Sequence, residues 1–211
     1  PDFMNVGFGD PAIVADRKTG RILLMCAAGN VSFLDGTREN HLRIPRFYSE
    51  DHGRTWSAPD DISEDLYKLF DESKSGPLKS MFITSGRIVQ SRYVKVGKYY
   101  RLYCAALQIT AKDQWTNAVL YSDDFGQSWK VLGNADVAAI PEGANEAKVE
   151  ELPGGDVVIS SRTDLEGRLF NVFTFTNLKK AIGSWGTMAH SSIHNNGIIT
   201  EKNSCNGELL I

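Results

Sequence analysis

A nine-residue segment occurs twice in the chain and a third time in a degraded form. Residues 48–56 read YSEDHGRTW, and residues 121–129 read YSDDFGQSW, 73 positions further on. The degraded copy, at 176–185, ends on Gly-Ser-Trp and has two extra residues between its Thr and its Trp. Self-similarity at such a period is typical of supersecondary units that stack on one another to bury their apolar faces.

A hairpin signal precedes each copy. Residues 15–21, 95–98 and 152–156 are short, Gly-containing stretches between two apolar runs. The apolar runs are rich in Val, Ile, Leu, Tyr and Phe and are bounded by Gly, Asp, Asn and Ser, which favours strands. Each unit is therefore predicted to contain a hairpin, a long loop, a strand, the repeated turn and a fourth strand. Only residues 64–70 have the spacing of a short helix.

The residue types of the repeated segment are those of a turn. Ser49 and Asp51 offer side-chain oxygens to backbone N–H groups of the turn, and Gly53 supplies a positive φ. Trp56 is expected to pack between neighbouring sheets. The pair Glu50 and Asp51 also fits acid–base or calcium chemistry, but recurrence of the segment in every unit favours a structural role.

The composition excludes several classes of protein. The 211 residues carry a net charge of −3, with 42% hydrophobic and 23% charged residues, as in an ordinary globular protein. No apolar run approaches the roughly 18 residues of a membrane span, and the sequence has no basic stripe for nucleic acid. Cys26, Cys104 and Cys205 lack CxxC spacing, and we expect the first two to be buried free thiols. The partner is expected to be a small molecule or a glycan.

These segments carry a resemblance to a known family. The element Ser-x-Asp-x-Gly-x-Thr/Ser-Trp is the Asp box, and its repetition resembles the six-bladed β-propeller of sialidases. Residues 7–20 are similar to the segment that opens a blade in bacterial sialidases. Residues 145–152, followed by 160–162, resemble the stretch that supplies their catalytic Glu and one arginine of the carboxylate-binding triad.

The fold class implied by the resemblance is all-β, a sialidase-type β-propeller with about three blades present. Residues 1–211 are predicted to be part of one such domain, with Asp boxes at 49–56 and 122–129 and a degenerate copy at 176–185. A closed propeller of four to eight blades needs roughly twice this length. The family's first and third arginines, its acid/base Asp and its nucleophilic Tyr have no matching positions here. We therefore expect a middle portion that lacks part of the active site.

The activity implied is that of an exo-α-sialidase, a retaining glycoside hydrolase that removes terminal sialic acid from glycoproteins, glycolipids and oligosaccharides. Sialic acid carries a carboxylate on its reacting carbon, which a planar guanidinium binds bidentately, and Arg162 matches that arginine. The same carboxylate repels an acidic nucleophile, and sialidases use a Tyr instead. Glu146 matches the base that deprotonates this Tyr.

Four further residues are candidates for contact with the sugar. Asp10 and Asn196 match residues that line the pocket, and Asn195 is an alternative to Asn196. Phe82 and the loop residue Trp115 face the N-acetyl group or the glycerol side chain in one interpretation, and pack in the core in the other. The resemblance implies no cofactor, and a secreted, periplasmic or cell-surface location.

Structural interpretations of the same residues stay open. Glu146 also belongs to a solvated acidic run, and Arg162 also fits a surface pair with Asp164. Asp10, which precedes a proline, also fits a turn at the entry to a strand. Arg43 lies in an Arg-Ile-Pro sequence like that of the first triad arginine, but only six residues before the Asp box, so we interpret it as a strand residue.

Two further alternatives concern metal binding and function. His190 and His194 have i, i+4 spacing, but the residues between them do not favour a helix, so a zinc pair is not predicted. The competing functional class is a non-catalytic Asp-box propeller that binds glycans or proteins.

Overall fold

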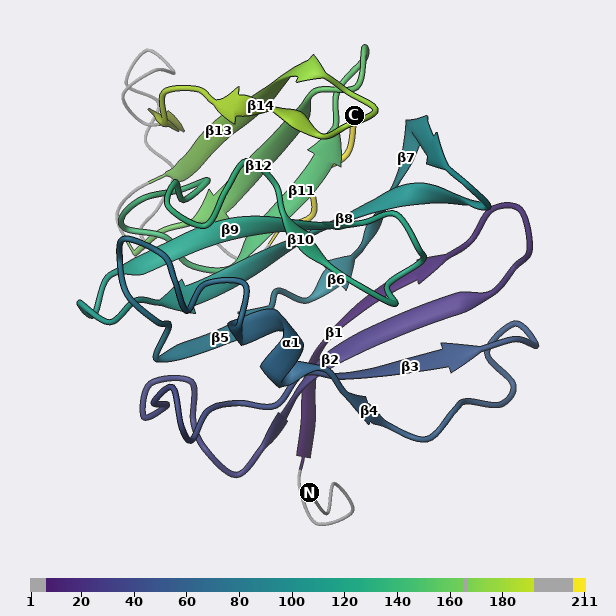
Figure 1. Cartoon of the computed structure of the whole chain (residues 1–211), viewed down its shortest axis with the longest axis horizontal. Coiled ribbons are helices and arrows are strands. Elements are labelled where there is room, and N and C mark those ends of the chain that lie inside the picture. The colour runs from purple at the N-terminus through teal and green to yellow at the C-terminus, as the bar shows by residue number, and fades with distance from the viewer. Residues whose placement is uncertain (1–6, 165–166, 192–206) are drawn as a thin grey trace.

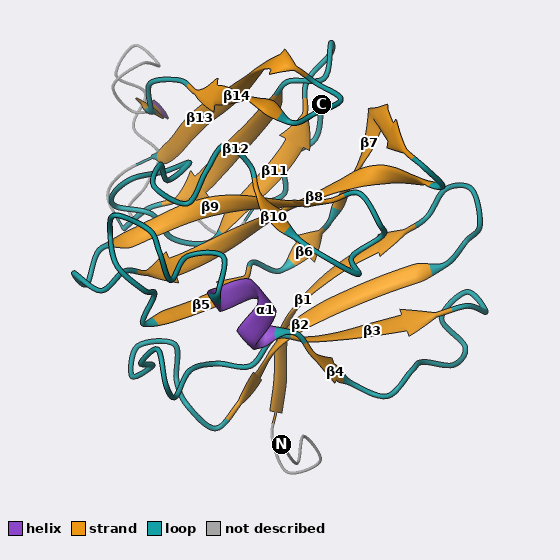
Figure 2. Ribbon diagram, in the orientation of Figure 1, coloured by secondary structure: helices purple, strands orange, loops and turns teal. Residues whose placement is uncertain are grey.

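The computed structural model describes residues 7–164, 167–191 and 207–211. These residues form three 5-stranded sheets, which follow one another from purple through teal to green in Figure 1. Nearly all of the regular structure is strand, as Figure 2 shows. The all-β prediction is confirmed.

The first sheet holds the first repeat unit, in the order β4-β3-β2-β1-β6. Its strands are β1 (Gly7–Ala15), β2 (Ile22–Gly29), β3 (Pro45–Ser49), β4 (Asp60–Asp61) and β6 (Gly86–Arg87). Strands β1 to β4 are antiparallel neighbours in chain order, whereas β6 pairs with β1 in parallel.

The second and third sheets repeat the four antiparallel strands but add their fifth strand in another place. The second has the order β10-β9-β8-β5, with β7 also on β8, and contains β5 (Ser80–Ile83), β7 (Val89–Val96), β8 (Tyr99–Ile109), β9 (Trp115–Ser122) and β10 (Lys130–Val131). The third has the order β11-β12-β13-β14, with β15 on β13, and contains β11 (Ala147–Glu151), β12 (Val157–Arg162), β13 (Arg168–Asn177), β14 (Ile182–Trp185) and β15 (Ala189–His190). The predicted four-strand unit is present in each sheet.

The sequence patterns missed the fifth strand of each sheet and lengthened the helix. Strands β6 and β15 are two residues long, too short for a periodic pattern, and β5 lies inside a long loop. Helix α1 spans Ser63–Tyr67, whereas 64–70 was predicted. After Tyr67 the backbone tightens, because Leu69 and Phe70 donate their N–H groups to carbonyls three residues back.

The Asp-box turns have the structure that their residue types predict. In the first, the Gly53 N–H donates to Ser49 Oγ at 2.8 Å, and the Thr55 N–H and hydroxyl donate to the two Asp51 carboxylate oxygens at 2.8 and 2.6 Å. The bonds from Thr55 lower the pKa of Asp51 to about 2. The second turn repeats the same bonds with its own Ser, Asp, Gly and Ser.

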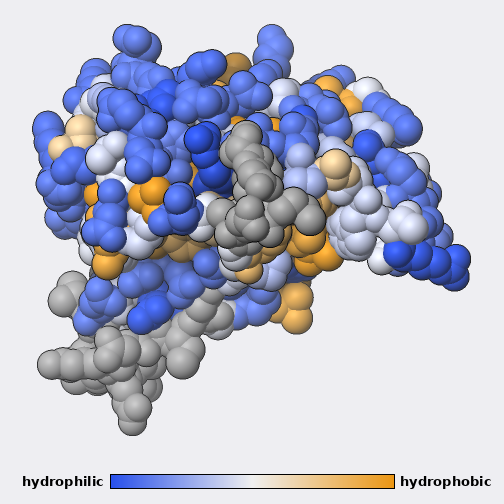
Figure 3. All heavy atoms as spheres, turned by 90° about the horizontal axis from the view of Figure 1, so that it is seen from below, coloured by the Kyte–Doolittle hydropathy of each residue, from blue (hydrophilic) through white to orange (hydrophobic). Residues whose placement is uncertain are grey.

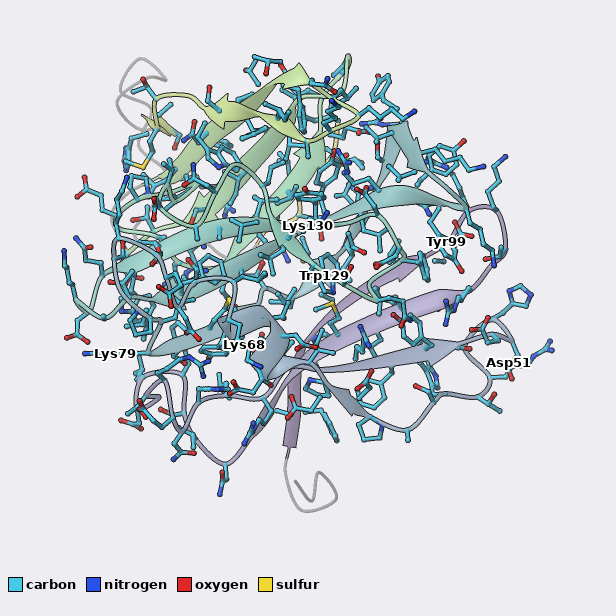
Figure 4. All side chains as sticks on the ribbon, in the orientation of Figure 1. Asp51, Lys68, Lys79, Tyr99, Trp129 and Lys130 are labelled. Atoms are coloured by element: carbon cyan, nitrogen blue, oxygen red, sulfur yellow. The ribbon has the colours of Figure 1, made fainter. Side chains whose placement is uncertain are left out.

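The tryptophans of the second and third boxes pack on the sheet that precedes their own. Trp129 of the second sheet is 7% exposed and belongs to the core between the first two sheets. Trp185 of the third sheet donates its indole N–H to the Leu132 carbonyl of the second at 3.3 Å. Trp56 is 40% exposed, because no sheet in the described part of the chain precedes the first. Figure 4 shows Trp129 in the middle of the molecule and Asp51 at its periphery.

Arginines tie each sheet to the turn of the next. Arg46 on β3 donates to the carbonyls of Gly126 and Gln127 in the second Asp box, at 2.6 and 2.7 Å. Arg101 on β8, which is 1% exposed, donates to the Leu178 and Lys179 carbonyls in the third turn, at 2.8 and 2.9 Å. The third turn is degraded in sequence, yet it is held in the same way.

The core consists of two apolar clusters, one between each pair of neighbouring sheets. Cys26 and Cys104 are buried and free, as predicted, and Cys205 lies outside the described residues. Some large apolar side chains, including Phe8 and Ile13 on β1, stay exposed. Figure 3 shows hydrophobic patches of this kind on the face seen from below. No helix in the described ranges is long and apolar enough to cross a membrane.

We predict that Gly126→Ala destabilises the fold more than Gly154→Ala. Both glycines have positive φ, +80° and +97°, which costs a non-glycine residue about 1 kcal/mol. A methyl group at Gly126 also overlaps the side chain of Leu23, which is fully buried, whereas one at Gly154 meets no atom within 4 Å. In urea unfolding, the free energy of unfolding should fall by about 3 kcal/mol for Gly126→Ala and by about 1 kcal/mol for Gly154→Ala. Equal falls in the free energy of unfolding would mean that a methyl group at position 126 does not overlap the Leu23 side chain.

Candidate active site

Glu146 and Arg162 lie side by side on the third sheet. Arg162 is the last residue of β12, and its backbone N–H donates to the Glu146 carbonyl at 2.8 Å, which continues the ladder between β11 and β12 by one residue. An Arg162 guanidinium nitrogen lies 3.2 Å from Glu146 Oε2. The hairpin turn at 152–156 therefore brings together two charges that are 16 residues apart in the sequence.

Glu146 is also part of the wall of a cavity of about 470 Å³. Its lining is more apolar than polar. Its polar side chains are Asp10, Asn145 and Glu146, and its apolar wall includes Ala27, Phe33, Leu34, Leu42, Phe82, Leu107 and Trp115. All three sheets contribute residues, so the cavity lies where they meet.

Aromatic rings form much of the apolar wall. The Phe33 ring lies edge-on to Phe82, with centroids 5.0 Å apart, and to Trp115, at 5.4 Å. Phe82 is 7% exposed, so it both packs in the core and lines the cavity. The prediction that Trp115 is a loop residue is wrong. It begins β9 and pairs with Ile109, because the β8–β9 hairpin extends further than the apolar run suggested.

Asp10 lies in an irregular part of β1. The register between β1 and β2 shifts between Gly9 and Ala12, and Asp10 has a φ of 49°, which is uncommon for a residue other than glycine. The expected turn at the entry to a strand is thus a bulge within the strand, and it turns the carboxyl group into the cavity. Burial raises the pKa of Asp10, and the nearby charge of Glu146 raises it further.

One N–H group of the Arg162 side chain has no hydrogen-bond acceptor in the part of the chain that the structure describes. This group is the buried Nε. The alternative partner, Asp164, instead accepts from the Asn145 side chain at 3.2 Å. Arg168 lies directly opposite Arg162 across β12 and β13, and burial, followed by the charge of Arg162, lowers the pKa of Arg168. Like charges so placed repel each other, and a bound anion reduces that repulsion.

Sequence reasoning missed several residues of this cluster. Asn145 and Lys148 were overlooked, although they flank Glu146 in the sequence, and Arg168 was overlooked although it faces Arg162 across the sheet. Side chains two residues apart in a strand lie on the same face, so the expected strand alone indicated that Lys148 is on the same side as Glu146. Phe33 lies in the loop between β2 and β3, where no periodicity points to it.

Several predicted residues lie elsewhere or are not described. Arg43 forms a β-bridge with Ala28 and lies 3.5 Å from Asp61, in keeping with a strand residue. Asn196, its alternative Asn195, and His194 lie outside the described residues. Within the described ranges, no cluster of three or more His, Cys, Asp or Glu residues could hold a metal ion.

The fold and the repeated turns define the class of this protein. Three successive sheets built of antiparallel four-strand units, the second and third each packed through its repeated turn on the one before, are blades of a β-propeller of the Asp-box type. The family described as the BNR repeat-like domain matches residues 4–200, and the chain belongs to this family.

Similar proteins are sialidases. Sialidase-3 of Rattus norvegicus is 29% identical over 167 residues, and the match covers 72% of this chain and 37% of that protein. The sialidase of Micromonospora viridifaciens is 30% identical over 164 residues, with coverages of 74% and 23%. The chain thus spans less than two fifths of the length of either relative. The resemblance to bacterial-type sialidases is confirmed.

Solved structures give the same result for the fold. The Hadza microbial sialidase Hz136 superimposes with a TM-score of 0.62 at 25% identity, over 85% of this chain and 33% of that one. The sialidase of Trypanosoma rangeli, at 16% identity, has a TM-score of 0.61 over 85% of this chain and 28% of that one. The β-propeller prediction is confirmed.

The effect of the Glu146 charge on Asp10 yields a prediction that needs no enzyme assay. Glu146→Gln removes the negative charge that disfavours ionisation of Asp10, so the pKa of Asp10 should fall. Titration of the Asp10 carboxyl carbon by NMR measures this. Glu142→Gln, in an exposed loop, is the matched control and should leave the pKa of Asp10 unchanged. If the pKa of Asp10 is the same in the Glu146→Gln variant as in the wild-type protein, the placement of the two carboxyl groups is contradicted.

Proposed function

We propose that this chain is part of an exo-α-sialidase, a retaining glycoside hydrolase that removes terminal sialic acid from glycoconjugates. The observation that carries the proposal is the contact of Glu146 with Arg162 at a cavity that also receives Asp10. This pair supplies a group that accepts a proton and a group that binds a carboxylate, side by side at one cavity. Because sialylated glycans are the proposed substrates, we place the protein outside the cytoplasm.

Arg162 is proposed to bind the substrate carboxylate. A guanidinium presents a planar set of N–H donors that a carboxylate accepts in pairs, and a lysine does not reproduce this geometry. The buried Nε without a partner supports this role. Arg168, beside it, adds positive potential to a chain with a net charge of −3.

Glu146 is proposed to act as a general base. Sialidases use a Tyr nucleophile, and a phenol attacks well only if its proton leaves as the bond to the sugar forms. A Glu146 carboxylate oxygen accepts that proton, the phenolate oxygen bonds to the anomeric carbon, and the glycosidic oxygen leaves with a proton from an acid. Water then releases the sugar from the Tyr, so the configuration is retained.

The remaining groups are proposed to come from sequence outside this chain. No Tyr lines the cavity within the described ranges, and the relatives are at least two and a half times as long as the part that matches. We therefore assign the Tyr, the acid and the further arginines of the site to the rest of the propeller.

The apolar wall is proposed to contact the parts of the sugar that carry no charge. Phe82 and Trp115, together with Phe33, offer ring surface in the wall of the cavity. Asp10 is proposed to accept hydrogen bonds from sugar hydroxyl groups.

Glu146→Gln and Arg162→Lys in the full-length protein should both impair hydrolysis of a fluorogenic sialoside. Loss of the base should lower kcat by about 10²-fold or more, and Arg162→Lys should act mainly by raising KM, because it removes the bidentate contact. Glu142→Gln is the control. Hydrolysis at the wild-type rate by both variants would reject these roles. A folded wild-type protein that binds sialosides without hydrolysing them would favour the non-catalytic class.

The isolated 211-residue chain should not hydrolyse the same sialoside, because the nucleophile and the acid are assigned to the rest of the propeller. A circular dichroism spectrum typical of strands serves as the control for folding. Turnover by this chain alone would show that it contains a complete site.

A further inference from the structure

The apolar wall of the cavity depends on a loop. Residues 30–44, between β2 and β3, contribute Phe33, Leu34 and Leu42 to the lining. The Phe33 ring packs on aromatic rings of the second sheet, although the loop follows a strand of the first. Connecting segments are the more mobile parts of a fold unless side-chain contacts hold them. The contacts that hold the 30–44 loop therefore determine whether the wall is in place when a ligand arrives.

Arg38 lies at the tip of this loop and binds two carboxylates. Thr37 and Asn40 exchange backbone N–H···O bonds of 2.9 and 3.2 Å, which form a tight turn around Arg38. Arg38 Nε and Nη2 donate to the two Asp71 carboxylate oxygens at 2.6 and 2.8 Å. Arg38 Nη1 and Nη2 donate to the two Glu64 carboxylate oxygens at 3.1 and 3.2 Å. The bonds from Arg38 lower the pKa of Glu64 to about 2 and also lower the pKa of Asp71.

A second contact of the loop is buried. His41 is 5% exposed, its ring stacks on Tyr67 with centroids 3.8 Å apart, and its Nδ1 lies 2.9 Å from the Leu42 carbonyl oxygen. The Tyr67 hydroxyl accepts from the Met81 N–H at 2.6 Å and donates to the Met81 carbonyl at 3.2 Å. Met81 directly precedes Phe82 on β5. The contact thus runs from one ring-bearing segment of the wall to the other.

Both contacts lead to helix α1, which carries Glu64 and Tyr67. The helix follows β4 of the first sheet and precedes β5 of the second, and Figure 1 shows it beside β5. Because the helix is bonded to β5 and also to the loop, it sets the position of Phe33 relative to Phe82. An exposed ion pair contributes little, but a guanidinium that is bidentate to two carboxylates is an exception. Arg38 is therefore a defined link between the loop and the helix.

We propose that Arg38 is a positioning residue that fixes the 30–44 loop, so that Phe33 stands in the apolar wall before a ligand binds. The inference rests on the proposed function, since it is there that the wall contacts the uncharged parts of the sugar. Arg38 acts through Phe33, which lines the cavity. Without the link, the loop populates other arrangements, and the affinity for substrate falls with the fraction of molecules in the binding arrangement.

The test uses variants of the full-length protein that contains this chain. Arg38→Lys keeps the charge but loses the planar set of donors. Asp71→Asn removes one of the two carboxylates. Arg54→Lys, at an exposed position, is the matched control. We would measure kcat and KM for a fluorogenic sialoside, and the NMR resonance of the Trp115 indole N–H, assigned with Trp115→Phe. This resonance reports the position of the Phe33 ring, whose centroid lies 5.4 Å from that of Trp115.

Arg38→Lys and Asp71→Asn should each raise KM by about fivefold, as expected if about one molecule in five keeps the loop in place. Neither should change kcat, because contacts with the wall are lost equally from the bound substrate and the transition state. Both should shift the Trp115 indole resonance. The double variant should add little to either single change, since both substitutions break one contact. Arg54→Lys should alter neither quantity.

Either a wild-type KM or a wild-type Trp115 resonance in Arg38→Lys would overturn the inference. So would a lowered kcat at the wild-type KM with loss of folded protein by circular dichroism, which assigns Arg38 to stability alone. If the wild-type protein has no sialidase activity, the proposed function fails. The Trp115 resonance then still decides whether Arg38 fixes the position of Phe33.

Discussion

The whole arrangement depends on the contact between a repeated turn and the sheet that precedes it. The Ser and Asp of the turn bind its own N–H groups, which leaves backbone carbonyls pointing outward, and an arginine of the preceding sheet donates to them. The tryptophan beside these carbonyls fills the apolar space. Charge-assisted hydrogen bonds fix the position of the turn, and apolar burial supplies most of the stabilisation.

This seating decides where the candidate site forms. Because each sheet is fixed to its neighbour, the ends of β1, β2, β8, β9 and β11 meet at one cavity, and groups far apart in the sequence become neighbours. Asp10 belongs to the first sheet, Phe82 to the second and Glu146 to the third. Each of the three sheets holds only some of these groups. The chemistry is therefore a property of the interfaces between repeats.

Much of the fold was predictable from the repeated turn, and much of the site was not. Ser49, Asp51 and Gly53 form a turn through hydrogen bonds and a positive φ that involve only neighbouring backbone. Their residue types were therefore enough to predict the turn. The pairing of Glu146 with Arg162 was predictable from a resemblance in spacing. Lys148 and Phe33 were not predicted, because their contacts are with other sheets. Lys148 donates a hydrogen bond to the Ser85 carbonyl, and the Phe33 ring packs on Trp115. Distances between sheets are set by packing, which a linear pattern does not encode.

The half-exposed Trp56 shows that the stacking has a direction. Every unit presents a turn at one end and an acceptor surface at the other, so neighbouring units join head to tail. Interfaces of this kind either close into a ring or continue without limit. A set of such blades that is not closed therefore carries two complementary ends, and each end is a surface that the other end of a second copy can satisfy. Ring closure both assembles the site and prevents polymerisation.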